Sequence, residues 1–279
     1  MTSRRRFDRA RAALAAASAV AAIPILVGPT VLGAVLAGPA VAAPRESAAP
    51  IGGPELGSAG LIVHPTADVP VPPQVDASGW LVADLDTGAV LAAQDPHGRY
   101  APASTLKVLT ALVAIPRLDP AGTVTATSEQ VDVDGTKVGI VPGHAYTVSM
   151  LLHGLLMVSG NDAARVVAGA LGGNDVVQGL MNGEAEHLQA LDTHAGSVTG
   201  LDAPGQTSSA YDLALLARAA LKLPAFAEAV ATPTYEFSGA GVAPFQISNH
   251  NPLLGHYAGT YGVKNGYTNA AQASFIGAA

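Results

Sequence analysis

Three short segments contain the residue types of an acylating serine site that works without a histidine. They are Ser104-Thr-Leu-Lys107, Ser159-Gly-Asn161 and Lys264-Asn-Gly266, in this order along the chain. A serine hydroxyl is a weak nucleophile near neutral pH and needs a base to take its proton. On a helix, Ser104 and Lys107 would share one face. The lysine amine could then accept that proton, provided that burial or a nearby cation keeps it neutral.

Lysine is scarce in this chain, so the positions of its lysines are informative. There are four, at positions 107, 137, 222 and 264, and two of them lie inside these segments. Each segment alone is a weak signal. A Ser-x-x-Lys pair is usually a solvated helix face, Ser-Gly-Asn is a common turn, and Lys-Asn-Gly is a common hairpin signal. Their combination favours one shared site.

The first segment is expected at the start of a helix. Pro102 suits a first helical turn, and the apolar spacing over residues 106–113 is helical. Ser104 would therefore lie near a helix N-terminus, where backbone N–H groups and the helix dipole favour negative charge. This position suits a nucleophile whose attack creates an oxyanion.

The second segment predicts a tight corner between two buried helices. The first, residues 149–157, is strongly apolar and stops at Ser159-Gly160, and Asn161-Asp162 is expected to cap the second, residues 163–171. Two more helices are expected over residues 176–188 and 211–221, the latter capped by Ser208 or Ser209.

Strands are expected at both ends of this helical region. The runs 80–84 and 89–93 flank a Thr-Gly turn and predict a hairpin. Near the C-terminus, strands are expected over residues 234–237, 245–248, 261–264 and 273–278. We therefore expect an α+β fold, in which the N- and C-terminal strands form one antiparallel sheet packed with a helical cluster.

The first 43 residues predict export. Five arginines stand among the first 11 residues, no charged residue lies in 12–43, and small residues end that stretch. Residues 1–43 are therefore expected to be an export signal, of either the twin-arginine or the ordinary secretory type, with an uncleaved membrane anchor as a third alternative. Residues 44–75 are expected to be a Pro/Gly/Ala-rich linker, and 76–279 the folded domain, acting in the periplasm or cell wall space.

Charge and cysteine content exclude several classes of function. Without residues 1–43 the chain keeps 9 of its 14 basic and 20 of its 21 acidic residues, a formal charge of −11. Such a module should avoid nucleic acid and anionic lipid, so membrane contact is expected only through an uncleaved signal. With no cysteine there is no thiolate metal site. We expect neither a metal nor a cofactor.

The segments and their surroundings resemble the D-alanyl-D-alanine carboxypeptidases. These are low-molecular-mass penicillin-binding proteins of the serine β-lactamase-like superfamily. The first motif of the family is similar to residues 101–111, the second to 151–164, and the third to 262–268. Residues 199–202 and 208–217 are similar to further stretches. The resemblance runs from about residue 76 to the end of the chain.

The resemblance implies a role for each site residue. Ser104 would attack the carbonyl between two D-alanines of a peptidoglycan stem peptide, with Lys107 as its base. Ser159 would relay a proton to the leaving amine, and Asn161 would bind the substrate backbone. The substrate carboxylate would be held by Lys264, and the backbone N–H groups of Ser104 and Tyr267 would form an oxyanion hole. β-Lactams would acylate the same serine. The implied substrate-binding residues are Lys264, Asn265, Gly266, Tyr267 and Thr268.

Two departures from the family pattern leave alternatives open. The third motif usually has Thr or Ser after its lysine, where this chain has Asn265. The family also continues past the C-terminal strand, so we expect the C-terminal part to be truncated. A catalytically impaired homologue, which binds peptidoglycan or β-lactam without turnover, is therefore the second hypothesis. A β-lactamase is the third, although no glutamate is evidently placed to activate the deacylating water.

Overall fold

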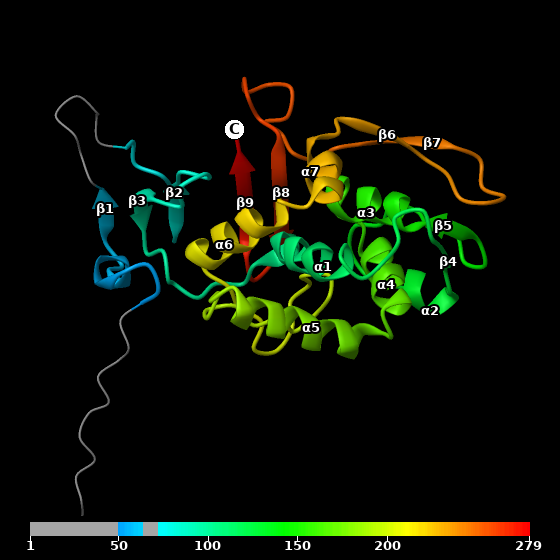
Figure 1. The fold of residues 1–279 in the computed structure, drawn as a ribbon, viewed down its shortest axis with the longest axis horizontal. Helices are drawn as coiled ribbons and strands as arrows, with labels where there is room; N and C mark the ends of the chain where they lie inside the picture. Colours follow the sequence, from blue (N-terminus) through cyan, green and yellow to red (C-terminus); the bar gives the residue numbers. More distant parts are fainter. Residues whose placement is uncertain (1–49, 64–71) are drawn as a thin grey trace, which may run out of the picture. The chain divides into compact units, whose positions relative to one another are not determined.

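The computed structural model describes residues 50–63 and 72–279 (Figure 1). The expected export signal, residues 1–43, lies outside the described residues. Part of the expected linker is folded: a 3₁₀ turn η1 (Pro54–Gly57) precedes strand β1 (Leu61–Val63), which pairs with β3 (Val90–Gln94). The expectation of a linker is therefore wrong for these residues. Leu56 and Ile62 are buried against Ala93 in a small apolar cluster. The sequence did not predict this cluster, because the many Gly and Pro residues around it are typical of a linker.

The N- and C-terminal strands form separate sheets. Strand β2 (Trp80–Ala83) pairs with β3 as the predicted hairpin, which gives the order β1-β3-β2. Strands β8 (Gly262–Thr268) and β9 (Gln272–Ala278) form their own antiparallel pair. The expectation of one sheet is wrong in the described part of the chain, because no hydrogen-bonded ladder joins the two groups there. Helix α6 (Ala210–Ala220) packs against both β2 and β9.

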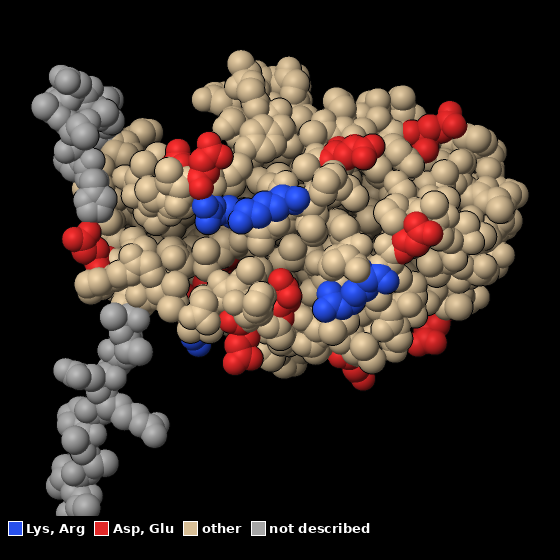
Figure 2. All heavy atoms as spheres, in the orientation of Figure 1, with Lys and Arg blue, Asp and Glu red and all other residues tan. Residues whose placement is uncertain are grey.

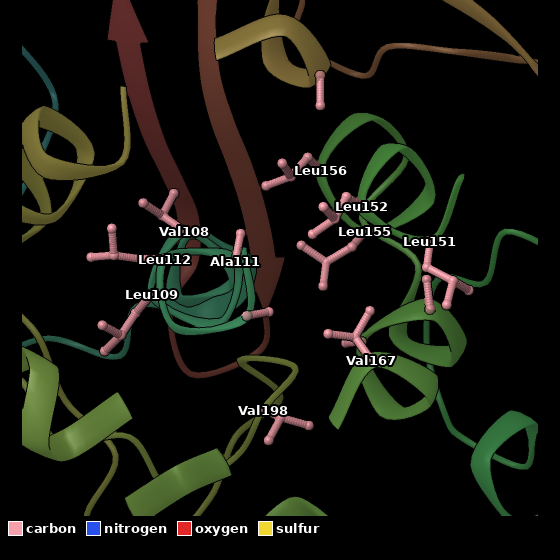
Figure 3. Packing of buried hydrophobic residues seen from close by; sticks show 14 of the residues in the cluster. Val108, Leu109, Ala111, Leu112, Leu151, Leu152, Leu155, Leu156, Val167 and Val198 are labelled. Atoms are coloured by element: carbon pink, nitrogen blue, oxygen red, sulfur yellow. The ribbon is translucent and has the colours of Figure 1, made fainter. Parts of the chain in front are cut away.

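Helix α1 (Lys107–Ala114) is the centre of the hydrophobic core. It follows the 3₁₀ turn η2 (Ala103–Leu106), and all of its side chains are buried. Three further helices pack against it together with α6. In Figure 3 the leucines of α3 point toward the side of α1 that carries Ala111, while Leu109 and Leu112 of α1 point to its other side. These helices are α3 (Val148–Met157), α4 (Asn161–Ala170) and α5 (Asn174–His187). A helix buried on all sides fixes the position of its first residue, Lys107, very firmly.

The remaining elements lie around this core. Helix α7 (Pro224–Ala231) was not expected, although Pro224 occupies the first turn as proline often does. Ser209 caps α6, as one of the two predicted alternatives. The other elements are β4 (Thr123–Thr125), α2 (Ser128–Val131), β5 (Ala145–Thr147), and the hairpin of β6 (Thr234–Phe237) with β7 (Phe245–Ser248). The α+β class is confirmed.

The surface carries few charged side chains. On the face drawn in Figure 2, most atoms belong to uncharged residues, with scattered acidic and basic groups among them. Among the described residues, no helix combines the length and hydropathy needed to span a bilayer.

Candidate active site

The expected nucleophile, Ser104, and its expected base, Lys107, lie close together where η2 joins α1. Ser104 lies in η2, Lys107 is the first residue of α1, and Lys107 Nζ is 3.0 Å from Ser104 Oγ. The local backbone is a 3₁₀ turn rather than the regular α-helix that the sequence predicted. Side chains at i and i+3 eclipse each other in a 3₁₀ turn. The turn therefore brings the amine directly to the hydroxyl.

The amine of Lys107 has two further oxygen neighbours. Its Nζ lies 2.6 Å from Asn161 Oδ1 and 2.5 Å from the backbone carbonyl oxygen of Thr199. Both oxygens can only accept hydrogen bonds, and a neutral amine has two N–H donors and one lone pair. When both donors serve these carbonyls, the lone pair faces the hydroxyl of Ser104. The arrangement therefore suits a base that takes the serine proton.

Burial and charge both favour the neutral amine. The Lys107 side chain is completely buried, and this loss of hydration lowers its pKa well below the ordinary value. The positive charge of Lys264 lowers the same pKa further, while the negative charge of Asp162 acts in the opposite direction. The two conditions that the sequence analysis required for a basic amine, burial and a second cation, are both present.

The corner between α3 and α4 presents the second segment. Ser159 has a φ of 64°, which places its backbone in the left-handed region that few residues other than glycine adopt. Its side chain is buried, yet among the described residues its hydroxyl forms no hydrogen bond with Ser104 or Lys107. The corner was predicted, whereas the direct contact that a proton relay needs is not made.

Asn161 belongs to the helix rather than to its cap. It is the first residue of α4, and Gly160 holds the cap position without a side-chain hydrogen bond, so the predicted cap is wrong. The Asn161 amide is held at both ends: its Nδ2 donates to the carbonyl of Asp134 at 2.7 Å, and its Oδ1 accepts from Lys107. The first turn of α4 therefore directs Asn161 at the lysine.

Asp162 is a structural residue of the site whose role sequence reasoning missed. Its buried carboxylate accepts hydrogen bonds from the backbone N–H groups of Val138, Gly139 and Ile140, at 2.9 to 3.0 Å. It also accepts one from the N–H of Ala163 at 2.9 Å. The acid beside Asn161 was interpreted as a helix cap. It instead joins the segment 138–140 to the second motif.

Strand β8 closes the site from the other side. A Cβ atom on Gly266 would lie only 2.6 Å from the backbone nitrogen of Ser104, so the strand runs directly against the nucleophile's peptide group. Lys264 lies in the same strand and is buried. Its Nζ donates to the carbonyl of Asn265 at 2.7 Å and lies 3.5 Å from the side-chain Oδ1 of the same residue. Burial lowers the pKa of Lys264 to about 7.

The end of β8 and the segment before it complete the arrangement. Tyr267 is largely exposed, while Thr268 donates its hydroxyl to Asp202 at 2.7 Å. A Cβ on Gly200, whose φ is +79°, would meet the carbonyl oxygen of Ala103 at 2.0 Å, so only glycine fits there. The segment 199–202 thus supplies the Thr199 carbonyl, this close approach and the Asp202 contact. From the sequence alone, this segment was recognised only by its similarity to a further stretch of the carboxypeptidase family.

The family comparison agrees with this geometry. A profile described as D-alanyl-D-alanine carboxypeptidase, of the peptidase S11 family, matches residues 66–279. The chain belongs to this family. The resemblance drawn from the three motifs is therefore confirmed, and with it the assignment to serine-type peptidases, a class of hydrolases.

Carboxypeptidases of this family from several bacteria are similar to the chain. D-alanyl-D-alanine carboxypeptidase DacB2 of Mycobacterium tuberculosis is 46% identical over 78% of this chain and 75% of its own length. DacD of Escherichia coli is 34% identical, over 80% of this chain but only 60% of its own length. The chain therefore spans about three quarters of the first relative and a smaller share of the second.

Solved structures of the family share the fold. The crystal structure of the D-alanyl-D-alanine carboxypeptidase from Mycobacterium tuberculosis matches with a TM-score of 0.72 and 45% identity, and the match covers 76% of this chain and 80% of that one. A Streptomyces DD-transpeptidase matches with a TM-score of 0.70 and 28% identity, over 73% and 84% of the two chains. The predicted penicillin-binding-protein architecture is confirmed.

Proposed function

We propose that this chain is a serine-type D-alanyl-D-alanine carboxypeptidase, which releases the terminal D-alanine of peptidoglycan stem peptides through an acyl-enzyme. The observation that carries the proposal is the buried amine of Lys107, 3.0 Å from Ser104 Oγ, whose other two neighbours are carbonyl oxygens. Family membership supports the substrate class, since the profile is that of D-alanyl-D-alanine carboxypeptidases.

The acylation step begins with proton transfer from Ser104 to Lys107. As the hydroxyl proton moves to Nζ, Oγ forms a bond with the carbonyl carbon between the two D-alanines. The charge that develops on the carbonyl oxygen is stabilised by the backbone N–H groups of Ser104 and Tyr267, a contribution of about 3–4 kcal/mol in such sites. The C–N bond then breaks. The leaving amine takes the proton of Lys107, relayed by Ser159 once its hydroxyl has come into contact with the lysine amine, and D-alanine departs.

The deacylation step uses the same base. Lys107, neutral again, takes a proton from a water molecule that attacks the ester carbonyl. The C–O bond to Ser104 breaks, the serine oxygen recovers a proton from Lys107, and the shortened peptide leaves. No other titratable side chain is needed, which agrees with the absence of histidine from the three short segments 104–107, 159–161 and 264–266.

Lys264 and Asn265 are proposed to hold the free carboxylate of the substrate. A buried ammonium without an anionic partner is costly, and a carboxylate entering beside it removes that cost. The bound anion would raise the pKa of Lys264 from about 7, so that the lysine is charged when substrate is present. The Asn265 amide would donate one hydrogen bond where the family usually has a hydroxyl.

The proposal extends to inhibitors and to the cell compartment. We propose that β-lactams acylate Ser104, because their reacting amide resembles the substrate's. We also propose that the domain works outside the cytoplasm, on the basis of the export pattern in residues 1–43. We propose contact with membrane only through that segment, if it is not cleaved.

One experiment tests the proposal directly. The wild-type chain and the variants Ser104→Ala and Ser248→Ala are incubated with a fluorescent penicillin, and D-alanine release from a stem pentapeptide is measured in parallel. Ser248 lies exposed in β7, outside the three motifs, and serves as the matched control. We expect labelling and release in the wild type and the Ser248→Ala variant, and neither in the Ser104→Ala variant. Labelling without release in the wild type would instead support the binding protein without turnover.

A further inference from the structure

A second group of ionisable side chains lies outside the proposed catalytic site. His97 lies between β3 and η2, Asp192 follows α5, and Asp212 lies in the first turn of α6. One ring nitrogen of His97 and one oxygen from each carboxylate all lie within 4.8 Å of one another. Three segments distant in sequence therefore bring three potential ligand atoms to one place.

The hydrogen bonds of His97 leave its Nδ1 facing acceptors. Its Nε2 lies 3.1 Å from the backbone carbonyl oxygen of Ile51, which can only accept, so Nε2 carries a proton. In the neutral ring, Nδ1 then has a lone pair, yet it lies 2.7 Å from Asp192 Oδ2, which is also an acceptor. A metal-binding histidine commonly donates its other N–H to a backbone carbonyl in this way. Either a second proton or a metal cation at Nδ1 would satisfy both groups.

Each carboxylate is held by one oxygen, which leaves the other for a ligand. Asp192 Oδ1 accepts from Arg99 Nε at 3.0 Å. Asp212 Oδ2 accepts from the backbone N–H of Asp192 and from the hydroxyl of Thr193, both at 2.8 Å. Supporting contacts of this kind orient the carboxylates that bind metal ions. The other oxygens are Oδ2 of Asp192, which faces His97 Nδ1, and Oδ1 of Asp212, which has no hydrogen bond.

The second oxygen of Asp212 has no partner. The residue is 1% exposed, and its Oδ1 is one of the few buried side-chain atoms in the described residues without a hydrogen bond. A buried carboxylate oxygen without a hydrogen bond is costly, and native structures rarely leave one without a reason. Because Asp212 belongs to the same cluster as His97, a bound cation would supply the missing partner.

We propose that His97, Asp192 and Asp212 form a binding site for one divalent transition-metal cation, with Zn²⁺ as the cation that best fits the donors. An imidazole nitrogen with two carboxylate oxygens suits zinc better than Mg²⁺ or Ca²⁺, which prefer oxygen alone. Zinc ligands stand about 2.0–2.2 Å from the ion, hence about 3.4 Å apart in a tetrahedron. A pair at the 4.8 Å limit must close by about 1.4 Å, and the pair of His97 Nδ1 and Asp192 Oδ2 at 2.7 Å must open by about 0.7 Å. A water would complete the coordination.

The proposed ion would act as a structural clamp. It would join the segment before η2, the segment after α5 and the start of α6, and through Ile51 it would also steady residues before β1. The chain has no cysteine and therefore no disulfide that could make such links. Because none of the three ligands contacts Ser104 or Lys107, the site is separate from the proposed acylation chemistry.

Metal binding is tested on the full chain, prepared without a histidine tag and treated with a chelator. Zinc is added in slight excess, unbound metal is removed by gel filtration, and the metal content is measured by mass spectrometry. We expect one zinc per wild-type chain and a melting temperature several degrees above that of the metal-free chain. Cobalt in place of zinc should give the visible absorption bands of a four- or five-coordinate site.

Variants distinguish this site from adventitious binding by other histidines. His97→Gln should bind zinc at least tenfold more weakly, and Thr193→Val, which removes one support of Asp212, about tenfold more weakly. His187→Gln changes an exposed histidine of α5 and should leave binding unchanged. Penicillin labelling of each variant reports that it is folded. Less than half an equivalent of zinc in the wild type, or equal binding by the wild type and the folded His97→Gln variant, would overturn the proposal and identify the cluster as an imidazolium–carboxylate pair.

Discussion

The helical side and the strand side of the candidate active site each contribute one buried lysine, and their surroundings differ. Lys107 has three oxygen neighbours supplied by three different parts of the chain. Lys264 bonds only to the adjacent residue, Asn265, and no ion pair reaches it from the described residues. The protein's own groups thus set the protonation state of Lys107. The second amine lacks an anionic partner, and substrate would provide one.

Removing the amine on the helical side should have the largest effect. We expect Lys107→Met to lower kcat/KM for D-alanine release by about 10³-fold or more, because the serine then has no base. The rate of acylation by a fluorescent penicillin should fall in parallel. Lys137→Met, which changes an exposed lysine, is the control. A Lys107→Met variant that stays within tenfold of the wild type would show that another group takes the proton.

Moving strand β8 away from Ser104 should lower kcat/KM by about 10²-fold. Gly266→Ala places a methyl group where only 2.6 Å is available beside the nitrogen of Ser104, so β8 must move away from the nucleophile. Gly179→Ala in α5 is the matched control, because a Cβ there has no neighbour within 4 Å. The control should be slightly stabilised by the better helix propensity of alanine. Equal activities of the two variants would contradict the close approach of strand and serine.

The pH dependence should report the two amines separately. Lys107 must be neutral and Lys264 charged, so kcat/KM should rise with pH as Lys107 loses its proton and fall again above about 7, where free Lys264 becomes neutral. In Lys264→Met the alkaline fall should disappear, and a lower, flat activity should remain. The measurement is kcat/KM from pH 5 to 10. An unchanged alkaline limb in that variant would assign the limb to another group.

Stability should follow the same titration with a definite sign. The folded pKa of Lys264, about 7, lies below the unfolded value of about 10.4. Between these values the unfolded chain binds more protons, so the free energy of unfolding should rise with pH across that window. In Lys264→Met, the free energy of unfolding should no longer rise with pH across this window. At pH 7 it should exceed that of the wild type by about 1–2 kcal/mol. Urea unfolding at pH 7 and 9 measures both effects, and a less stable variant would argue against a costly buried amine.

The smallest change is expected at Asn265. Threonine would remove the amide oxygen that lies 3.5 Å from Lys264 Nζ and would restore a compact hydroxyl donor. We expect Asn265→Thr to raise kcat/KM about two- to tenfold, the size of one hydrogen bond, mainly through a lower KM. A decrease would mean that the pocket of this chain has adapted to the amide.

Much of the site could be predicted because its chemistry is local in sequence. The pair Ser104 and Lys107 is one turn apart, and the corner at Ser159 is announced by Gly160 between two apolar runs. The functions of Thr199, Gly200 and Asp162 could not be predicted in this way. Thr199 acts through its backbone carbonyl, which every residue type has, and Gly200 through the absence of a side chain. Asp162 binds backbone N–H groups more than 20 positions away, whereas the local sequence pattern predicted that it caps a helix.

The fold was predictable to a similar depth. Periodic apolar patterns identified α1, α3 and α4, as well as the hairpin of β2 and β3. Sequence alone could not decide whether the N- and C-terminal strands pair in one sheet. The pairing of strands so far apart in sequence depends on how the helices between them pack. The packing of α6 against both β2 and β9 could not be read from the pattern of either strand.

The carboxylate of Asp162 has a mechanical consequence. Its three hydrogen bonds to the backbone N–H groups of residues 138–140 attach this segment to the first turn of α4, which also carries Asn161. A displacement of residues 138–140 would therefore be transmitted through Asp162 to the first turn of α4 and to the Asn161 amide that touches Lys107. The direction of the lysine lone pair thus depends on a segment that does not itself touch the lysine.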